Sequence, residues 1–167
     1  MATRADFSPE QWQALRNAPQ LVALATAAAG NSGLFGTLHE GVAMASTIAA
    51  VLRGPQPLLH EIFAKEDMQA AQEQIKTSMK AVTDRAALGS YLQTSALDAT
   101  KAALGALAAK GASADAEAYR ALLTDIGDKV ANAAKEGGFL GFGGERVSDG
   151  ERQFLALLKA ALAGTAA

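Results

Sequence analysis

The sequence predicts a single all-α domain, and three observations support this prediction. Alanine, which favours helix formation and lets helices pack closely, makes up 40 of the 167 residues. Large apolar residues recur at the spacing of an amphipathic helix, and no segment alternates with the period of two that marks a strand. Capping boxes at Ser8 and Ser148 each predict the start of a helix. We therefore expect a compact bundle of six to eight helices.

Two prolines determine how the first helices are placed. Pro9 lies inside the first capping box, at the first helical position, so it is expected to begin a short helix over about 9–16. Pro19 is expected to begin a second helix, because proline is tolerated in the first turn and disrupts a helix interior. That second helix covers about 17–29 and is apolar nearly all round, so we expect it at the centre of the bundle.

Proline, glycine and capping residues separate the remaining helices. Gly54-Pro55-Gln56-Pro57 is the clearest break in the chain. Thr83-Asp84 and Ser113 are expected to cap helices, and Lys110-Gly111 is expected to close one. The expected segments are a helix over 34–53, a short turn or helix over 58–64, and helices over 66–82, 85–109, 114–136 and from 149 onward.

These helices are assigned to one domain over residues 8–164, preceded by an N-terminal tail over residues 1–7, because the chain is long enough for one real core.

A weak internal sequence repeat fits either an ancient duplication or coincidence in a chain rich in alanine and glycine. A shift of 108 positions lays Gly30, Gly33 and Gly36 over Gly138, Gly141 and Gly144.

Composition excludes several classes of function. The net charge is −2, from 17 acidic and 15 basic residues with no like-charged block, which argues against nucleic-acid binding. The absence of cysteine excludes disulfides, thiolate metal sites and cysteine nucleophiles. The longest apolar runs are shorter than the roughly 20 residues that span a membrane, and no secretory signal is recognised. We expect a cytoplasmic protein without a cofactor or metal, and a homo-oligomer is compatible with the sequence.

The segment 137–144 is the most informative stretch. Five glycines surround Phe139, Leu140 and Phe142, between two helical segments. Glycine beside large apolar side chains indicates a shaped loop. The three side chains either plug the core of the bundle or form a docking surface for another protein. A phosphate-binding loop is disfavoured, because the segment lacks the Gly-Lys-Ser/Thr ending of a P-loop.

Both histidines precede a glutamate, as His39-Glu40 and His60-Glu61. These residue types can ligate metals, but adjacent helical side chains diverge by about 100°, so one pair does not chelate an ion easily. His39 and His60 could meet if the third helix lies against residues 58–64. A catalytic histidine is disfavoured, because no serine lies in a recognisable nucleophile context. Three methionines line an adaptable groove or belong to the core: Met44, Met68 and Met79.

The C-terminal part resembles an uncharacterised family of bacterial, mostly proteobacterial, all-helical proteins. The shared pattern is KEGGFLGFGG at 135–144, followed by Val147, Ser148 and Glu151, and the FSPEQW start and the LVALA segment are also similar. That family implies no known function. A remoter similarity is to tellurite-resistance TerB-like domains. In those domains an aspartate precedes the start of the corresponding helix, and the resemblance implies that this position binds a cation. Gly143 stands at the position of that aspartate.

We therefore expect a non-enzymatic interaction or stress-associated module that acts through the loop 137–144. The alternative is a TerB-like domain that binds a cation or a small ligand through converging carboxylates of Glu40, Glu61 or Glu151. An enzyme that uses His39 or His60 is the third hypothesis. The candidate binding residues are Phe139, Leu140, Phe142, His39, Glu40, His60, Glu61 and Glu151.

Overall fold

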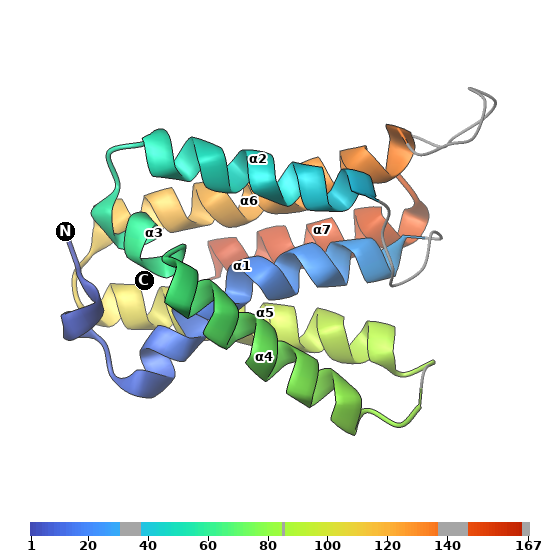
Figure 1. Cartoon of the computed structure of the whole chain (residues 1–167), viewed down its shortest axis with the longest axis horizontal. Coiled ribbons are helices and arrows are strands. Elements are labelled where there is room, and N and C mark those ends of the chain that lie inside the picture. Colours follow the sequence, from blue (N-terminus) through green and yellow to red (C-terminus); the bar gives the residue numbers. More distant parts are fainter. Residues whose placement is uncertain (31–37, 85, 137–146, 165–167) are drawn as a thin grey trace.

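The computed structural model describes residues 1–30, 38–84, 86–136 and 147–164, and all regular structure in these ranges is helical (Figure 1). The all-α bundle and its expected number of helices are confirmed for this part of the chain. The elements are a 3-10 helix η1 (Arg4–Asp6) and the helices α1 (Pro9–Ala29), α2 (Leu38–Arg53), α3 (Pro57–Ile62), α4 (Lys65–Ala81), α5 (Leu88–Ala109), α6 (Ser113–Glu136) and α7 (Asp149–Ala163).

Helix α1 is the central element, as its apolar sequence predicts. It packs against α5, α6 and α7, and α4 crosses it on another side, whereas α2 lies along α6 (Figure 1). The core between these helices is built mainly from aliphatic side chains, together with several aromatic rings. Its largest fully buried members are Leu15, Val22, Leu58, Ile62, Leu92, Leu104, Leu107, Tyr119, Leu123, Ile126, Phe154 and Leu158.

The structure corrects the expected boundary at Pro19. Residues 9–29 form one continuous helix, and Pro19 lies inside it. A proline has no N–H, so the carbonyl of Leu15, four residues earlier, loses its partner in the helix. The hydroxyl of Tyr119 on α6 donates a hydrogen bond of 2.6 Å to that carbonyl oxygen. Tyr119 is fully buried, and this burial raises the pKa of its hydroxyl well above the usual value, which keeps the donor protonated.

Helix ends follow the sequence signals at most positions. Both capping boxes form, and in each the serine oxygen accepts from the backbone three residues later: Ser8 caps α1 and Ser148 caps α7. Gly111 has a φ of 62° and ends α5 in a Schellman motif, with Ala112 N–H donating to the Leu107 carbonyl at 3.1 Å. The expected start of α5 is wrong, because Asp84 holds a turn through Ala86 N–H and the helix begins only at Leu88.

The first seven residues belong to the folded unit. Ala2 and Phe7 are buried, and the Ala2 N–H donates to the Asp115 carboxylate at 2.7 Å. The Arg4 N–H donates to Glu61 at 2.6 Å, so η1 rests on α3. The expectation of a separate tail over residues 1–7 is therefore corrected. The reason is tertiary, because the partners of this segment lie 57 and 113 positions away.

The helix α7 approaches the end of α1 very closely. A Cβ atom on Gly150 would overlap the carbonyl oxygen of Ala29, so only glycine fits at this position of α7. This contact places the start of α7 against the last turn of α1. In the described part of the chain, no helix combines the length and the apolar character needed to cross a membrane.

Candidate functional site

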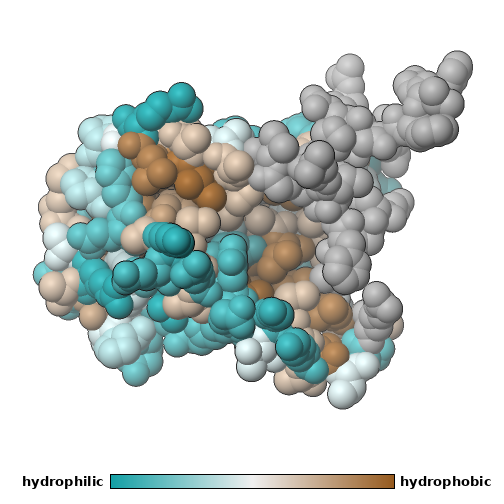
Figure 2. Space-filling view, viewed as in Figure 1, coloured by the Kyte–Doolittle hydropathy of each residue, from teal (hydrophilic) through white to brown (hydrophobic). Residues whose placement is uncertain are grey.

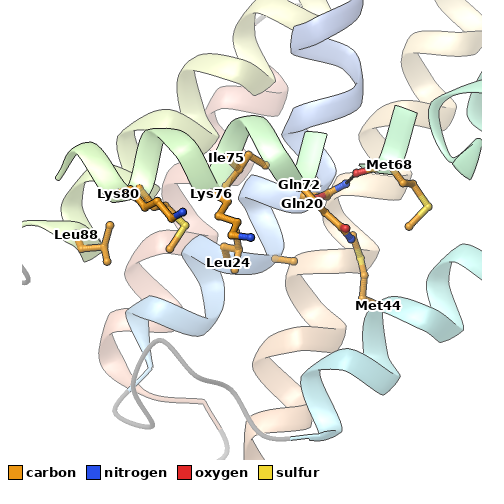
Figure 3. Close-up of a pocket in the computed structure, with 11 residues that line it drawn as sticks. Gln20, Leu24, Met44, Met68, Gln72, Ile75, Lys76, Lys80 and Leu88 are labelled. Carbon is orange, nitrogen blue, oxygen red and sulfur yellow. Dashed lines mark hydrogen bonds between the residues drawn. The ribbon is translucent and has the colours of Figure 1, made fainter. Parts of the chain in front are cut away.

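An apolar groove lies between α2 and α4, over the exposed side of α1 (Figure 3). Its volume is about 520 Å³, and it opens to solvent rather than enclosing a cavity. Ala23 and Leu24 of α1 form the floor. Figure 2 shows apolar surface in this gap, bordered by hydrophilic side chains. The walls are mainly Met44 from α2 and three residues of α4: Met68, Ile75 and Met79.

The groove follows from the apolar patterns of α1 and α4. Since the second half of α1, residues 21–29, is apolar nearly all round and α5, α6 and α7 cover its other sides, some apolar surface remains uncovered. On α4, the lining residues Met68, Gln72, Ile75 and Met79 are spaced by three or four positions, so they share one face. This face meets α1 only in part, because α4 crosses α1 instead of lying along it (Figure 1).

A polar network holds the first half of α4 on the bundle. Asp67 is buried, and its carboxylate accepts a hydrogen bond of 2.8 Å from the indole N–H of Trp12. The same carboxylate pairs with Arg4 at 3.0 Å and with Arg16 at 3.5 Å. One turn further along α1, the Gln20 amide donates to the Met68 carbonyl at 3.1 Å. These contacts position the Met68 end of the groove.

Two lysines border the groove on the second half of α4. Lys76 and Lys80 are both exposed and lie one turn apart, and both line the groove. Lys76 also lies 3.8 Å from Glu73, but this pair is exposed and therefore weak. The only other polar lining residues are Gln20 and Gln72, and no acidic side chain of the described residues lines the groove. The described part of the border is consequently electropositive.

In the structure, the His60 side chain connects α3 to the end of α2. It lies in α3, and its Nε2 is 3.0 Å from the Val51 carbonyl oxygen and 2.9 Å from that of Gly54. With its proton on Nε2, the ring donates to these carbonyl oxygens at the end of α2, and that of Val51 also accepts the Gly54 N–H at 2.9 Å. The hypothesis that His39 and His60 meet is wrong. His39 lies in the first turn of α2, and 12 residues of helix place it about 18 Å from Val51, which His60 contacts.

The predicted carboxylates do not converge either. Glu61 accepts the Arg4 N–H in α3, at the opposite end of the bundle from the start of α7 (Figure 1). Glu151 is buried at that start, where one oxygen accepts the Ser148 N–H at 2.8 Å and the other, Oε1, is buried without a hydrogen-bond partner. Glu40 lies in the first turns of α2, and the structure describes neither its side chain nor that of His39.

Metal-ligating residues do not gather in the part of the chain that the structure describes: no three His, Cys, Asp or Glu side chains could hold one ion there. The converging-carboxylate hypothesis therefore has no support among these residues. The loop residues Phe139, Leu140 and Phe142 lie outside the described residues, as do most glycines of the internal sequence repeat.

Sequence reasoning found part of the groove. It named Met44, Met68 and Met79 as lining either an adaptable groove or the core, and the structure places all three in the groove. It missed Leu24 and the two lysines of α4. The sequence of α4 contains a signal for this groove. Its apolar stripe is narrow, lysines at positions 76 and 80 lie beside it, and few neighbouring residues are of a kind that is usually buried.

Comparisons with protein-family models, with curated proteins and with solved structures give no match for this chain. The resemblances to the proteobacterial helical family and to TerB-like domains therefore stay predictions.

Proposed function

We propose that this protein is a non-enzymatic binding module whose groove takes the apolar face of an amphipathic helix from a partner protein. The observation that carries the proposal is the open apolar groove along α1, flanked by α2 and α4. A partner helix laid on the floor formed by Ala23 and Leu24 would complete the cover of α1. Burial of apolar surface on both partners would supply the binding free energy.

The shape of the groove favours a helix over a small molecule. Its volume of about 520 Å³ lies within the usual range of small-molecule pockets. Such pockets, however, bury most of the surface of their ligand, whereas this groove is open to solvent. An amphipathic helix needs to bury only one face, so an open groove suits it better.

The methionines of the groove support the same proposal. Met44, Met68 and Met79 come from two helices that face each other across the floor. Methionine is unbranched and flexible, so these side chains can repack around leucine or phenylalanine anchors of a partner. Met-lined grooves are well suited to helices whose apolar faces differ in detail.

The loop 137–144 remains a separate proposal. Exposed Phe139, Leu140 or Phe142 would add a second contact surface, and an association with stress is likewise a prediction. The groove proposal does not depend on either, because all residues that carry it lie in α1, α2 and α4.

The test uses a fluorescent peptide designed as an amphipathic helix, with leucines at i, i+3, i+4 and i+7 and neutral glutamines on its other faces. We expect saturable binding by anisotropy. Leu24→Glu and Met79→Glu should each weaken it at least about tenfold, because they place a charge where apolar side chains dock. Leu52→Glu is the matched control, since Leu52 is exposed on α2 outside the groove and its replacement should leave binding unchanged.

Two results would overturn the proposal. One is equal binding by the Leu24→Glu and Leu52→Glu variants, with circular dichroism showing that both are folded. The other is the absence of peptide binding together with saturable uptake of a decanoate probe, which would make the groove a small-molecule site.

A further inference from the structure

We propose that the groove selects a partner helix with an acidic flank, recognised by Lys76 and Lys80. This inference rests on the proposed function and adds the charge of the partner. Both lysines belong to the wall of α4, and Figure 3 shows the Lys76 side chain directed from α4 towards the floor of the groove. A lysine of this kind can cover apolar surface with its alkyl stem and keep its ammonium group in contact with water.

Among the side chains that the structure describes, the charges that face the groove leave this border positive. The floor helix has no charged residue between Asn17 and Ala29, and α2 has none between Met44 and Leu52. On α4 itself, Glu73 lies 3.8 Å from Lys76, but its side chain is 76% exposed and it does not line the groove. Asp84, after α4, accepts the Ala86 N–H in its own turn. A docked helix therefore meets two cations without an opposing acid among the described lining residues.

The spacing of the lysines specifies the pattern on the partner. Residues four apart on a helix are separated by about 6 Å along the axis, so the side chains of Lys76 and Lys80 leave α4 at that interval. Two carboxylates at i and i+4 on the flank of a partner helix match this interval when the helix lies along α4. Like charges at these positions would repel, so the same pair of lysines disfavours basic amphipathic helices.

The experiment compares three labelled peptides with the same leucine anchors and with glutamate, glutamine or lysine at the two flank positions. For the wild-type protein at low ionic strength, we expect the glutamate peptide to bind about five- to tenfold more tightly than the lysine peptide. The difference should shrink at about 0.5 M salt, because the border is exposed to solvent.

The decisive variant is the double substitution Lys76→Gln and Lys80→Gln. It should lower the affinity for the glutamate peptide about three- to fivefold and leave the glutamine peptide unchanged. The matched control is Lys65→Gln with Lys159→Gln, which removes the same net charge from exposed lysines outside the groove. This control should preserve the preference for the glutamate peptide.

The failures of the two proposals are distinguishable. Equal binding of all three peptides overturns the acidic flank and leaves the groove as a helix site. A loss of preference in the control variant also overturns it, because the effect would then come from overall charge. If the double variant also binds the glutamine peptide more weakly than the wild type does, the lysines contribute through apolar contact, which again contradicts charge recognition. If none of the three peptides binds, the proposed function itself fails.

Discussion

The two faces of α1 contain similar residues and have different surroundings. On one face, Leu15, Ala18, Val22 and Ala25 are completely buried under neighbouring helices. On the other face, the small and aliphatic residues Ala23 and Leu24 are only partly covered and form the floor of the groove. The comparison teaches that burial along this helix depends on its neighbours, because residues of the same kind occur on both faces.

The neighbours differ in how they meet α1. Neighbouring helices pack closely over the buried face. At the C-terminal end of α1 the contact with α7 is so close that only glycine fits at position 150. On the groove side, α4 is held near its start by Asp67 and by the Gln20 hydrogen bond to Met68. Further along α4, Gln74 still accepts hydrogen bonds from Arg16 and Asn17 of α1. The crossing of the two helices nevertheless leaves the groove open beside Lys76 and Lys80 (Figure 1).

The largest effect is expected from truncating one leucine on each face of α1. Leu15→Ala should cost about 2–5 kcal/mol of unfolding free energy, because it empties a fully buried site. Leu24→Ala should cost only about 1 kcal/mol, because Leu24 is partly exposed before the change. Urea unfolding measures both values. Equal losses would mean that both faces are covered in solution, and the open groove would then be wrong.

The next effect concerns the tightness of the sealed side. Gly150→Ala should destabilise the protein by about 3 kcal/mol, because its Cβ would press on backbone of α1 that cannot move aside. Gly127→Ala is the matched control in α6. There the new Cβ would lie 2.8 Å from the end of the flexible Leu155 side chain, so the change should stay within about 1 kcal/mol. Thermal unfolding that ranks the two variants in reverse would contradict this close approach.

The smallest effect tests the hydrogen bond that accommodates Pro19. Tyr119→Phe should cost about 1–3 kcal/mol, because it leaves the buried Leu15 carbonyl without its donor. In a Pro19→Ala background the backbone N–H of residue 19 can bond to this carbonyl, so the same substitution should cost less. Unfolding measurements on the four proteins of this double-mutant cycle give the coupling. Equal costs in both backgrounds would show that Tyr119 acts through packing alone.

Much of the fold was predictable because helix signals are local. The capping boxes at Ser8 and Ser148 and the glycine at position 111 each determine a helix end through residues three to five positions away. The signal at Thr83-Asp84 failed because the Asp84 carboxylate stabilises a turn before the helix begins. A capping residue indicates that backbone N–H groups need acceptors, and a turn has the same need as a helix.

The candidate site was less predictable. The sequence named three methionines of the groove, but periodicity alone does not distinguish a groove from a core, since both require apolar residues on one face. His60 was considered for a metal or for catalysis, and the structure shows its ring capping the end of α2. The sequence could not anticipate this role, because it depends on how α3 folds back after the break at Gly54 and Pro57.

By itself the sequence determined that this protein is helical, where most of its helices lie and that α1 belongs at the centre. These properties follow from alanine content, apolar spacing and capping, all of which act within a few residues. Only the tertiary structure decided that Pro19 stays inside α1, because its compensating donor Tyr119 is 104 positions from the carbonyl it serves. It also decided that Leu24 and Met79 line an open groove, since the angle at which α4 crosses α1 depends on contacts between distant segments.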